Sequence, residues 1–184
     1  MTSGDLRVWI NGRLVPADQP ALLPIDHGLT VGDGVFETLK VVAGQPFALT
    51  RHLRRLSRSA AGLGLPDPDP DAARRGVEAV LTAGPPIPFG RLRITMTGGP
   101  GPLGSRRGEA TPTLLVLAAP ITRPESSTSV VLAPWSRNEL GAVAGLKTTS
   151  YAENVVALAH ARDRGASEAM LANTRGQLCE GPGS

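Results

Sequence analysis

An Asn-Gly pair between two short apolar runs is the strongest local constraint on how this chain can fold. Val8-Trp9-Ile10 precedes Asn11-Gly12, and Leu14-Val15 follows it. Asn and Gly both accept the positive φ angles that a type I′ turn requires, and such a turn joins antiparallel strands without splaying them. The sequence therefore predicts that the fold opens with a β-hairpin.

Further strands and helices are expected to alternate along the chain. Hydrophobic periodicity and turn residues predict strands over 35–42, 46–49, 91–97, 113–118, 130–133, 168–172 and 177–179, and helices over 50–63, 71–82 and 151–164. Thr50 is the expected cap of the first helix, and an Asp of the Pro-Asp run 66–71 the cap of the second. In the third helix, Val155, Leu158 and Ala159 are expected to face inward. The polar stretch 120–129 predicts a domain boundary near residue 120.

Bulk composition narrows the class of protein. The 184 residues are 41% hydrophobic and 19% charged, which allows a buried core in one or two domains. A net charge of +3 and few aromatic residues argue against nucleic acid binding. No apolar run approaches the ~20 residues that span a bilayer, and Met1 to Trp9 lacks a signal-peptide pattern. The single cysteine, Cys179, excludes an internal disulfide and suits a reducing compartment. Together, these features lead us to expect a soluble cytoplasmic protein. No metal site is expected, since none of the three histidines stands at ligand spacing.

Lysine is the most informative residue type because the chain has only two, Lys40 and Lys147, among 19 basic residues. Lys147 follows an apolar loop and precedes a predicted helix. Partial burial there would favour a nucleophilic amine and make a Schiff base possible. A lysine at the surface beside a helix start is the alternative interpretation for an isolated Lys.

The residues around Lys147 form a pattern with a known counterpart. They are Lys147, Tyr151, Asn154, Gly165, Glu168-Ala169, Gly176 and Glu180-Gly181, and three further blocks precede them at Asp26-His27-Gly28, 32–38 and 52–56. In order and spacing, these segments resemble the class IV aminotransferases, the fold type IV family of pyridoxal 5′-phosphate (PLP) enzymes. That family holds branched-chain aminotransferases, D-amino acid aminotransferases and 4-amino-4-deoxychorismate lyases.

The resemblance implies a cofactor site. Lys147 would carry PLP covalently and act as the catalytic base, and Glu180 would hold the pyridine nitrogen protonated. Arg55 matches the arginine that meets the cofactor phosphate, and Tyr151 the tyrosine on the cofactor's 3′-oxygen. Without the family, Arg55 is one of several solvated helix arginines and Tyr151 a core aromatic.

The resemblance also implies substrate contacts. Arg93 occupies the position of a substrate-side arginine, with a cross-strand ion pair as the alternative, and Phe36 would face the substrate pocket or the core. Thr97-Gly98-Gly99 departs from the Thr-Arg-Gly of D-amino acid aminotransferases and many lyases, whereas Phe36-Glu37-Thr38 is more similar to the lyases. The two clues conflict, so the subfamily stays open.

For the whole chain, the resemblance implies an α/β fold of the α+β type. We expect a two-layer N-terminal domain over 1–119 and an incomplete, barrel-like PLP domain over 120–184, with the active site between them. The resemblance also implies that the chain is C-terminally truncated and that it forms a homodimer. The expected activity is amino transfer between an amino acid and a 2-oxo acid; the alternatives are aminodeoxychorismate cleavage, or an inactive fragment that serves as a binding or dimerisation module.

Overall fold

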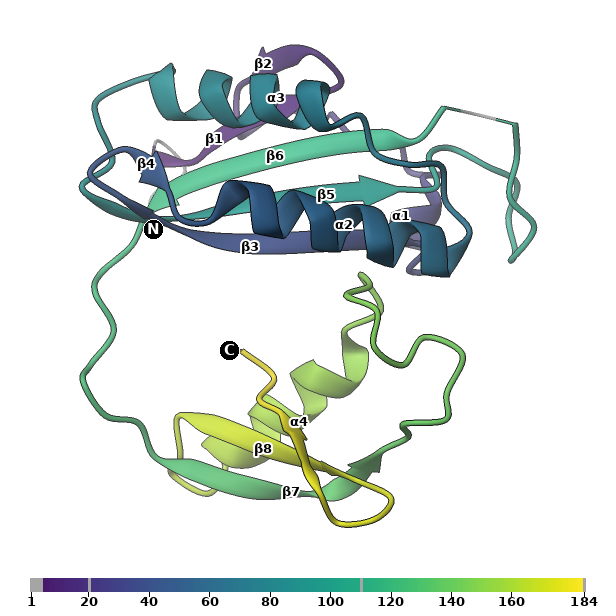
Figure 1. Ribbon diagram of the computed structural model, residues 1–184, viewed down its shortest axis with the longest axis vertical. Coiled ribbons are helices and arrows are strands. Elements are labelled where there is room, and N and C mark those ends of the chain that lie inside the picture. Colours follow the sequence, from purple (N-terminus) through teal and green to yellow (C-terminus); the bar gives the residue numbers. More distant parts are fainter. Residues whose placement is uncertain (1–4, 20, 110, 184) are drawn as a thin grey trace. The chain divides into compact units, whose positions relative to one another are not determined.

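The computed structural model describes residues 5–19, 21–109 and 111–183. Its internal contacts divide the chain into two compact units (Figure 1). The first unit runs to Arg123 and also includes Leu146–Thr149, and the second comprises Pro124–Gly145 and the chain from Ser150 onward. The chain therefore leaves the first unit at Arg123 and returns to it for the four residues that contain Lys147.

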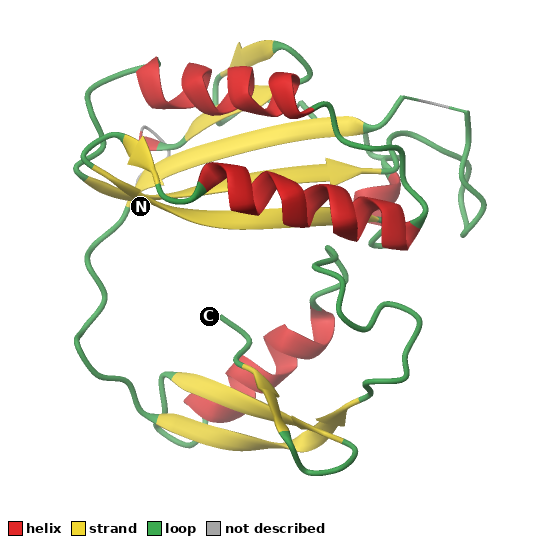
Figure 2. Cartoon of the chain, viewed as in Figure 1, coloured by secondary structure: helices red, strands yellow, loops and turns green. Residues whose placement is uncertain are grey.

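A six-stranded antiparallel sheet forms one layer of the first unit (Figure 2). Its strands lie in the order β2-β1-β6-β5-β3-β4. Their bounds are β1 (Arg7–Ile10), β2 (Arg13–Val15), β3 (Gly34–Val42), β4 (Gln45–Pro46), β5 (Phe89–Thr97) and β6 (Thr113–Pro120). The expected opening hairpin is confirmed, since Asn11 and Gly12 take φ angles of 44° and 94°.

Helices form the second layer. After the short α1 (His27–Thr30), α2 (Leu49–Leu63) packs over β3, and α3 (Pro70–Thr82) packs over β1 and β6. Between the helices and the sheet lies one apolar core, to which β3 and β5 contribute Val35, Leu39, Val41, Leu92, Ile94 and Met96. Because side chains alternate along a strand, Phe36 and Arg93 belong to the opposite, helix-free face.

Two expectations about the start of α2 are wrong. The second hairpin is short, because β4 ends at Pro46 and the helix already begins at Leu49. Ala48, with a φ of 54°, occupies the N-cap position without a side-chain hydrogen bond, so Thr50 lies inside the first turn. Its hydroxyl instead accepts from Arg74. The Pro-Asp run behaves as expected: Asp69 caps α3 by accepting from the Asp71 backbone N–H.

The second unit is a small sheet with one helix. Its elements are β7 (Val130–Arg137), α4 (Ala152–Arg162), β8 (Glu168–Asn173) and β9 (Leu178–Glu180). β7 and β8 are parallel, α4 crosses between them, and β9 returns antiparallel to β8. The helix buries Asn154, Ala157 and Ala161, whereas Val155 is 66% exposed, so the expected inward face was wrong. In the described part of the chain, no helix has the length and apolar character needed to cross a membrane.

Candidate active site

Three of the residues singled out from the sequence meet on the helix-free face of the first sheet. The ring of Phe36, on β3, has the Arg93 guanidinium carbon 3.6 Å and the Lys147 ammonium 4.6 Å from its centroid. Arg93 comes from β5, where it pairs in register with Thr38, two residues along from Phe36. Both cations gain electrostatically from an aromatic face, so Phe36 brings a guanidinium and an amine together.

The backbone of Lys147 is held against the edge of β3. The Lys147 carbonyl accepts from the Phe36 N–H at 3.0 Å, and the Thr149 N–H donates to the Gly34 carbonyl at 2.8 Å. The Lys147 N–H donates to the hydroxyl of Ser59 on α2 at 3.1 Å. Residues 147–149 thus act as a short additional strand, which fixes the Cα position from which the amine projects.

Arg55 is held by a buried acid next to Phe36. Its Nε and Nη2 each lie 2.6 Å from a carboxylate oxygen of Glu37, and His52 Nδ1 lies 2.7 Å from the same carboxylate. The Glu37 side chain is fully buried, whereas that of Arg55 is 43% exposed. A bidentate, charge-assisted pair of this kind fixes the plane of the guanidinium.

Arg55 lies one helical turn from the contact that α2 makes with Lys147. Residues four apart on a helix share a face, so Arg55 and Ser59 project from the same side of α2. Ser59 is buried and binds the Lys147 backbone. The Arg55 side chain therefore projects from the side of α2 that binds the Lys147 backbone.

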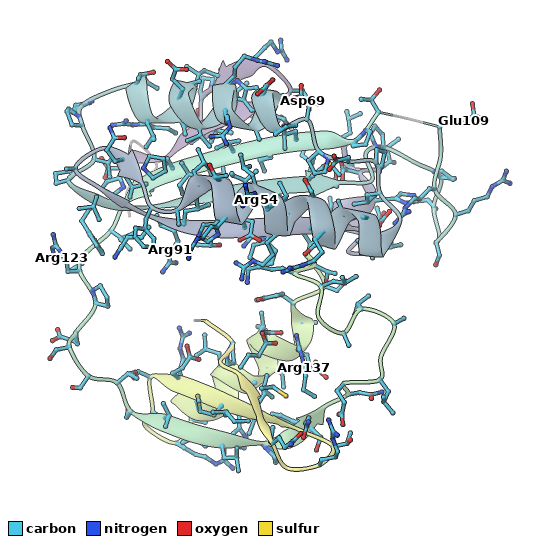
Figure 3. The ribbon with its side chains drawn as sticks, viewed as in Figure 1. Arg54, Asp69, Arg91, Glu109, Arg123 and Arg137 are labelled. Carbon is cyan, nitrogen blue, oxygen red and sulfur yellow. The ribbon has the colours of Figure 1, made fainter. Side chains whose placement is uncertain are left out.

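Tyr151 and Glu180 belong to the second unit. Tyr151 immediately precedes α4, and Glu180 ends β9. Arg137 is at the end of β7 (labelled in Figure 3). Its Nη2 lies 2.6 Å from one oxygen of Glu180, and its Nη1 lies 2.6 Å from Glu153. The roles of Tyr151 and Glu180 at the cofactor stay predictions.

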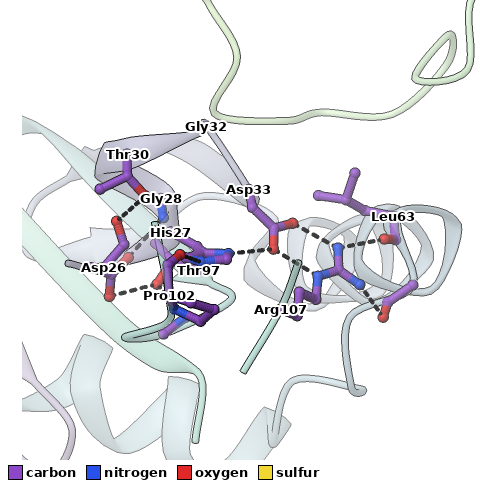
Figure 4. Close-up of polar contacts among 12 residues, drawn as sticks. Asp26, His27, Gly28, Thr30, Gly32, Asp33, Leu63, Thr97, Pro102 and Arg107 are labelled. Carbon is purple, nitrogen blue, oxygen red and sulfur yellow. Dashed lines mark hydrogen bonds and ion pairs between the residues drawn. The ribbon is translucent and has the colours of Figure 1, made fainter. Parts of the chain in front are cut away.

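A second polar network lies at the end of the first sheet where residues 147–149 pair (Figure 4). Arg107, from the loop after β5, donates to both carboxylate oxygens of Asp33, with Nε to Oδ2 at 2.7 Å and Nη2 to Oδ1 at 2.6 Å. These hydrogen bonds hold the pKa of Arg107 above its ordinary value, against the opposing effect of burial. The same guanidinium donates to the carbonyls of Leu63 and Gly64 at the end of α2.

This network gives a physical reason for the glycine at position 98. A Cβ added to Gly98 would lie 2.5 Å from the Asp33 carboxylate. An arginine at this position, as in the Thr-Arg-Gly pattern, would have to displace the carboxylate that binds Arg107. The Asp33–Arg107 pair therefore explains why Gly98 stands here in place of the arginine of that pattern.

Sequence reasoning did not find several residues that support the site. Glu37 and His52 stood within recognised blocks, but nothing indicated that they would share one carboxylate-centred contact with Arg55. The i, i+3 spacing of His52 and Arg55 on a predicted helix was the available signal. Nothing in the sequence indicated a role for Ser59 or Arg107. Among the described residues, no group of three or more His, Cys, Asp and Glu side chains is arranged to hold a metal ion.

Comparison with known proteins identifies the family. A sequence model described as amino-transferase class IV matches residues 34–184, which is most of the chain. This chain is a class IV aminotransferase family member. The match includes Phe36, Arg55, Arg93, Lys147 and Glu180, and so the assignment made from the sequence is confirmed at the level of the family.

Individual relatives of this class IV chain carry more than one activity in their names. A bifunctional aminodeoxychorismate lyase / D-amino acid transaminase of Mycobacterium tuberculosis is 31% identical over 96% of this chain and 64% of its own length. A D-alanine aminotransferase of Bacillus licheniformis is 28% identical over 97% of this chain and 64% of its own length. The chain thus spans about 64% of these relatives.

Solved structures agree on the fold. The PLP-bound form of a hypothetical aminotransferase from Mycobacterium tuberculosis is 31% identical with a TM-score of 0.82, covering 97% of this chain and 66% of that one. A 4-amino-4-deoxychorismate lyase from Pseudomonas aeruginosa is 32% identical with a TM-score of 0.77, covering 95% and 64%. The expected α/β fold of the class IV family is therefore confirmed.

Proposed function

We propose that this class IV chain takes part in PLP-dependent transfer of an amino group between an amino acid and a 2-oxo acid. One observation carries the proposal: the Lys147 amine lies on the helix-free face of the sheet, 4.6 Å from the Phe36 ring that also contacts Arg93. An amine that binds a carbonyl cofactor and a guanidinium that binds a carboxylate are the two groups this reaction requires of the protein.

The side chains present fit the cofactor. Lys147 supplies an amine for a covalent bond to its aldehyde, and Arg55, whose side chain is 43% exposed, supplies a guanidinium for its phosphate. Glu180 would accept from the pyridine N–H, and the Tyr151 hydroxyl would donate to the ring oxygen. When bound, PLP supplies an electron sink for the carbanion formed at the substrate Cα.

Lys147 has a second task once its amine is released by the incoming amino acid. A primary amine held beside the substrate can take the proton from Cα and return it at another carbon, which is general acid–base catalysis. The backbone hydrogen bonds from Phe36 to Lys147 and from Thr149 to Gly34 keep the base at a constant distance from the sheet. The same residue thus holds the cofactor and moves the proton.

Charge on the helix-free face favours carboxylate substrates. Arg93 is the proposed carboxylate ligand, and its guanidinium lies over the ring of Phe36, which is 3% exposed. Further along the same strands, Lys40 faces Arg91 in register, and both side chains are exposed. Arg91 is labelled in Figure 3. Like charges directly opposite one another repel, and an anion on this face relieves that repulsion.

An absorbance titration with PLP tests the proposal. The chain offers a matched control because it has only two lysines. A visible band should form with wild type and with Lys40→Ala and should be absent with Lys147→Ala. A band that survives in Lys147→Ala, or no band in any of the three proteins, would contradict the proposal and favour an inactive binding or dimerisation module.

Aminodeoxychorismate cleavage to 4-aminobenzoate and pyruvate is the second candidate. Phe36-Glu37-Thr38 is similar to the lyase group, and the relatives include a lyase and a bifunctional lyase/transaminase. The PLP-loaded protein should be offered aminodeoxychorismate and, separately, an amino acid with a 2-oxo acid. Formation of 4-aminobenzoate without amino transfer would assign the lyase reaction.

We also propose a homodimer in the cytoplasm. Apolar side chains are exposed on residues 22–31, namely Leu22, Leu23, Ile25, Leu29 and Val31, and a second copy could cover them. The exposed thiol of Cys179 suits a reducing compartment. Sedimentation equilibrium should give twice the chain mass, and a monomer at micromolar concentration would contradict the dimer.

A further inference from the structure

We infer that Arg107 is a positioning residue for Lys147, acting through Asp33 and the end of α2. The inference rests on the proposed function for the importance of Lys147, but its geometry is independent of any cofactor. Arg107 has five N–H donors, and its guanidinium makes four hydrogen bonds of 2.6–2.7 Å to three residues. A surface arginine engaged on this scale joins elements that would otherwise be separate.

The first element that Arg107 holds is the chain before β3. Asp33 stands between Gly32 and Gly34, and both of these glycines bind Thr149, two residues after Lys147. The Thr149 hydroxyl donates to the Gly32 carbonyl at 2.9 Å, and the Thr149 N–H donates to the Gly34 carbonyl at 2.8 Å. Arg107 therefore fixes the three residues against which the lysine segment pairs.

The residues in this pairing are closely packed and cannot shift independently. A Cβ on Gly34 would lie 2.9 Å from the Met96 carbonyl oxygen and 3.0 Å from the Thr149 hydroxyl. The Asp33 backbone is also tied on both sides, since its N–H donates to the His27 carbonyl and its carbonyl accepts from Gly98. A shift of the Asp33 carboxylate would consequently be passed on to Thr149.

The second element that Arg107 holds is the C-terminal part of α2. Its donors satisfy the Leu63 and Gly64 carbonyls, which the helix itself leaves open at its end. One turn earlier, the Ser59 hydroxyl accepts from the Lys147 N–H. Leu146 packs against Gly62, where an added Cβ would lie 2.5 Å from the Leu146 side chain. Both supports of the lysine segment thus converge on one guanidinium.

Amide hydrogen exchange of the cofactor-free chain is the direct test. Arg107→Gln removes the charge and the bidentate contact, so the Thr149 and Phe36 amides should exchange about tenfold faster, while Val116 in the middle of β6 stays unchanged. Arg106→Gln is the matched control, because Arg106 is exposed and its side chain makes no polar contact with the described residues. It should leave all three amides unchanged.

Two further variants keep the test decisive. Asp33→Asn should reproduce the effect, and combining it with Arg107→Gln should add little, because both act through one contact. Arg107→Lys keeps the charge but not the fork, and should rescue exchange only in part. Faster exchange confined to loop residues 98–109, or equal acceleration at Val116, would overturn the inference.

A PLP titration gives the second readout. Misplacing the amine should raise the PLP concentration needed for half of the visible band by about tenfold in Arg107→Gln, with the final intensity retained. An unchanged titration together with faster Thr149 exchange would also overturn the positioning role. If wild type forms no band, the proposed function fails, and the exchange result still decides whether Arg107 holds the lysine segment.

Discussion

At the scale of single residues, Glu37 is the acid that links β3 to α2. It is fully buried, yet it carries a carboxylate that contacts both Arg55 and His52 on α2. Burying a charge is costly unless it is paired and hydrogen-bonded, and these two partners provide that compensation. The residue that follows Phe36 in sequence therefore sets the orientation of the proposed phosphate ligand.

Glu37→Gln should lower the free energy of unfolding by about 2 kcal/mol, because it leaves Arg55 without its counter-charge in a partly hydrated position. Urea denaturation followed by circular dichroism measures the change. Arg54→Ala, at the exposed neighbouring position on α2, should change stability by less than about 0.5 kcal/mol. A loss below that value for Glu37→Gln would show that the pair adds nothing to stability.

At the scale of elements, α3 illustrates how capping and close packing fix one helix. The Asp69 carboxylate accepts from the backbone N–H groups of Ala72 and Asp71, which hold its pKa below the ordinary value. On the inner side of the helix, Gly76 allows the backbone to approach Trp9 and Val116 on the sheet. The two features make separate predictions.

The cap should make stability depend on pH in a defined window. A carboxyl group whose pKa is lowered by folding stabilises the fold above its unfolded pKa, about 3.9, and this contribution is lost as the pH falls through the folded pKa. The urea midpoint of wild type should therefore exceed that of Asp69→Asn near neutral pH, and the difference should shrink below about pH 4. A difference that is constant with pH would exclude the ionised cap.

Gly76→Ala should destabilise the protein although alanine is the better helix former. The added Cβ would lie 2.8 Å from both Trp9 Cε3 and Val116 Cγ2. Helix propensity returns about 1 kcal/mol, whereas overpacking a tight core costs about 1–3 kcal/mol, so a net loss of about 1 kcal/mol is expected. Glu78→Ala on the exposed side of α3 is the control in thermal melts, and a raised melting temperature for Gly76→Ala would refute the packing argument.

Most elements could be predicted from the sequence because their signals are local. The Asn11-Gly12 turn and the cap in the Pro-Asp run are examples. Features that depend on tertiary packing could not be predicted from the sequence. Ala48 takes a left-handed conformation that ends the hairpin early, and α4 turns Asn154 inward rather than Val155. For the site, Lys147 was found through the family pattern, but its Ser59 and Thr149 supports depend on pairing between distant segments.

At the scale of the whole molecule, the two units differ in the size of their cores. Among the described residues, the buried cluster of the first unit holds 17 members, including eight Leu, Ile and Met side chains, whereas that of the second holds six, five of them alanine. Apolar burial is the main stabilising contribution, so local stability should follow this difference. Because the two buried clusters are separate, we retain the proposal of a domain boundary near residue 120.

Amide hydrogen exchange should therefore be faster in the second unit than in the first. Amides in β7 and β8 are expected to exchange faster than those in β3 and β5 at neutral pH, because opening the smaller core exposes less apolar surface. Mass spectrometry of peptic peptides can follow both regions in one sample. Equal protection factors across the two regions would show that the units open only together.

The pairing of residues 147–149 with β3 also sets an order of events during synthesis. The Thr149 hydroxyl reaches Gly32 across 117 positions of the chain. Contacts of such long sequence separation form late, and until then the first half of β3 presents an unpaired edge to its surroundings. On the ribosome, the remaining strands of this sheet emerge before Lys147 does, so the reactive amine reaches a support that has already been made.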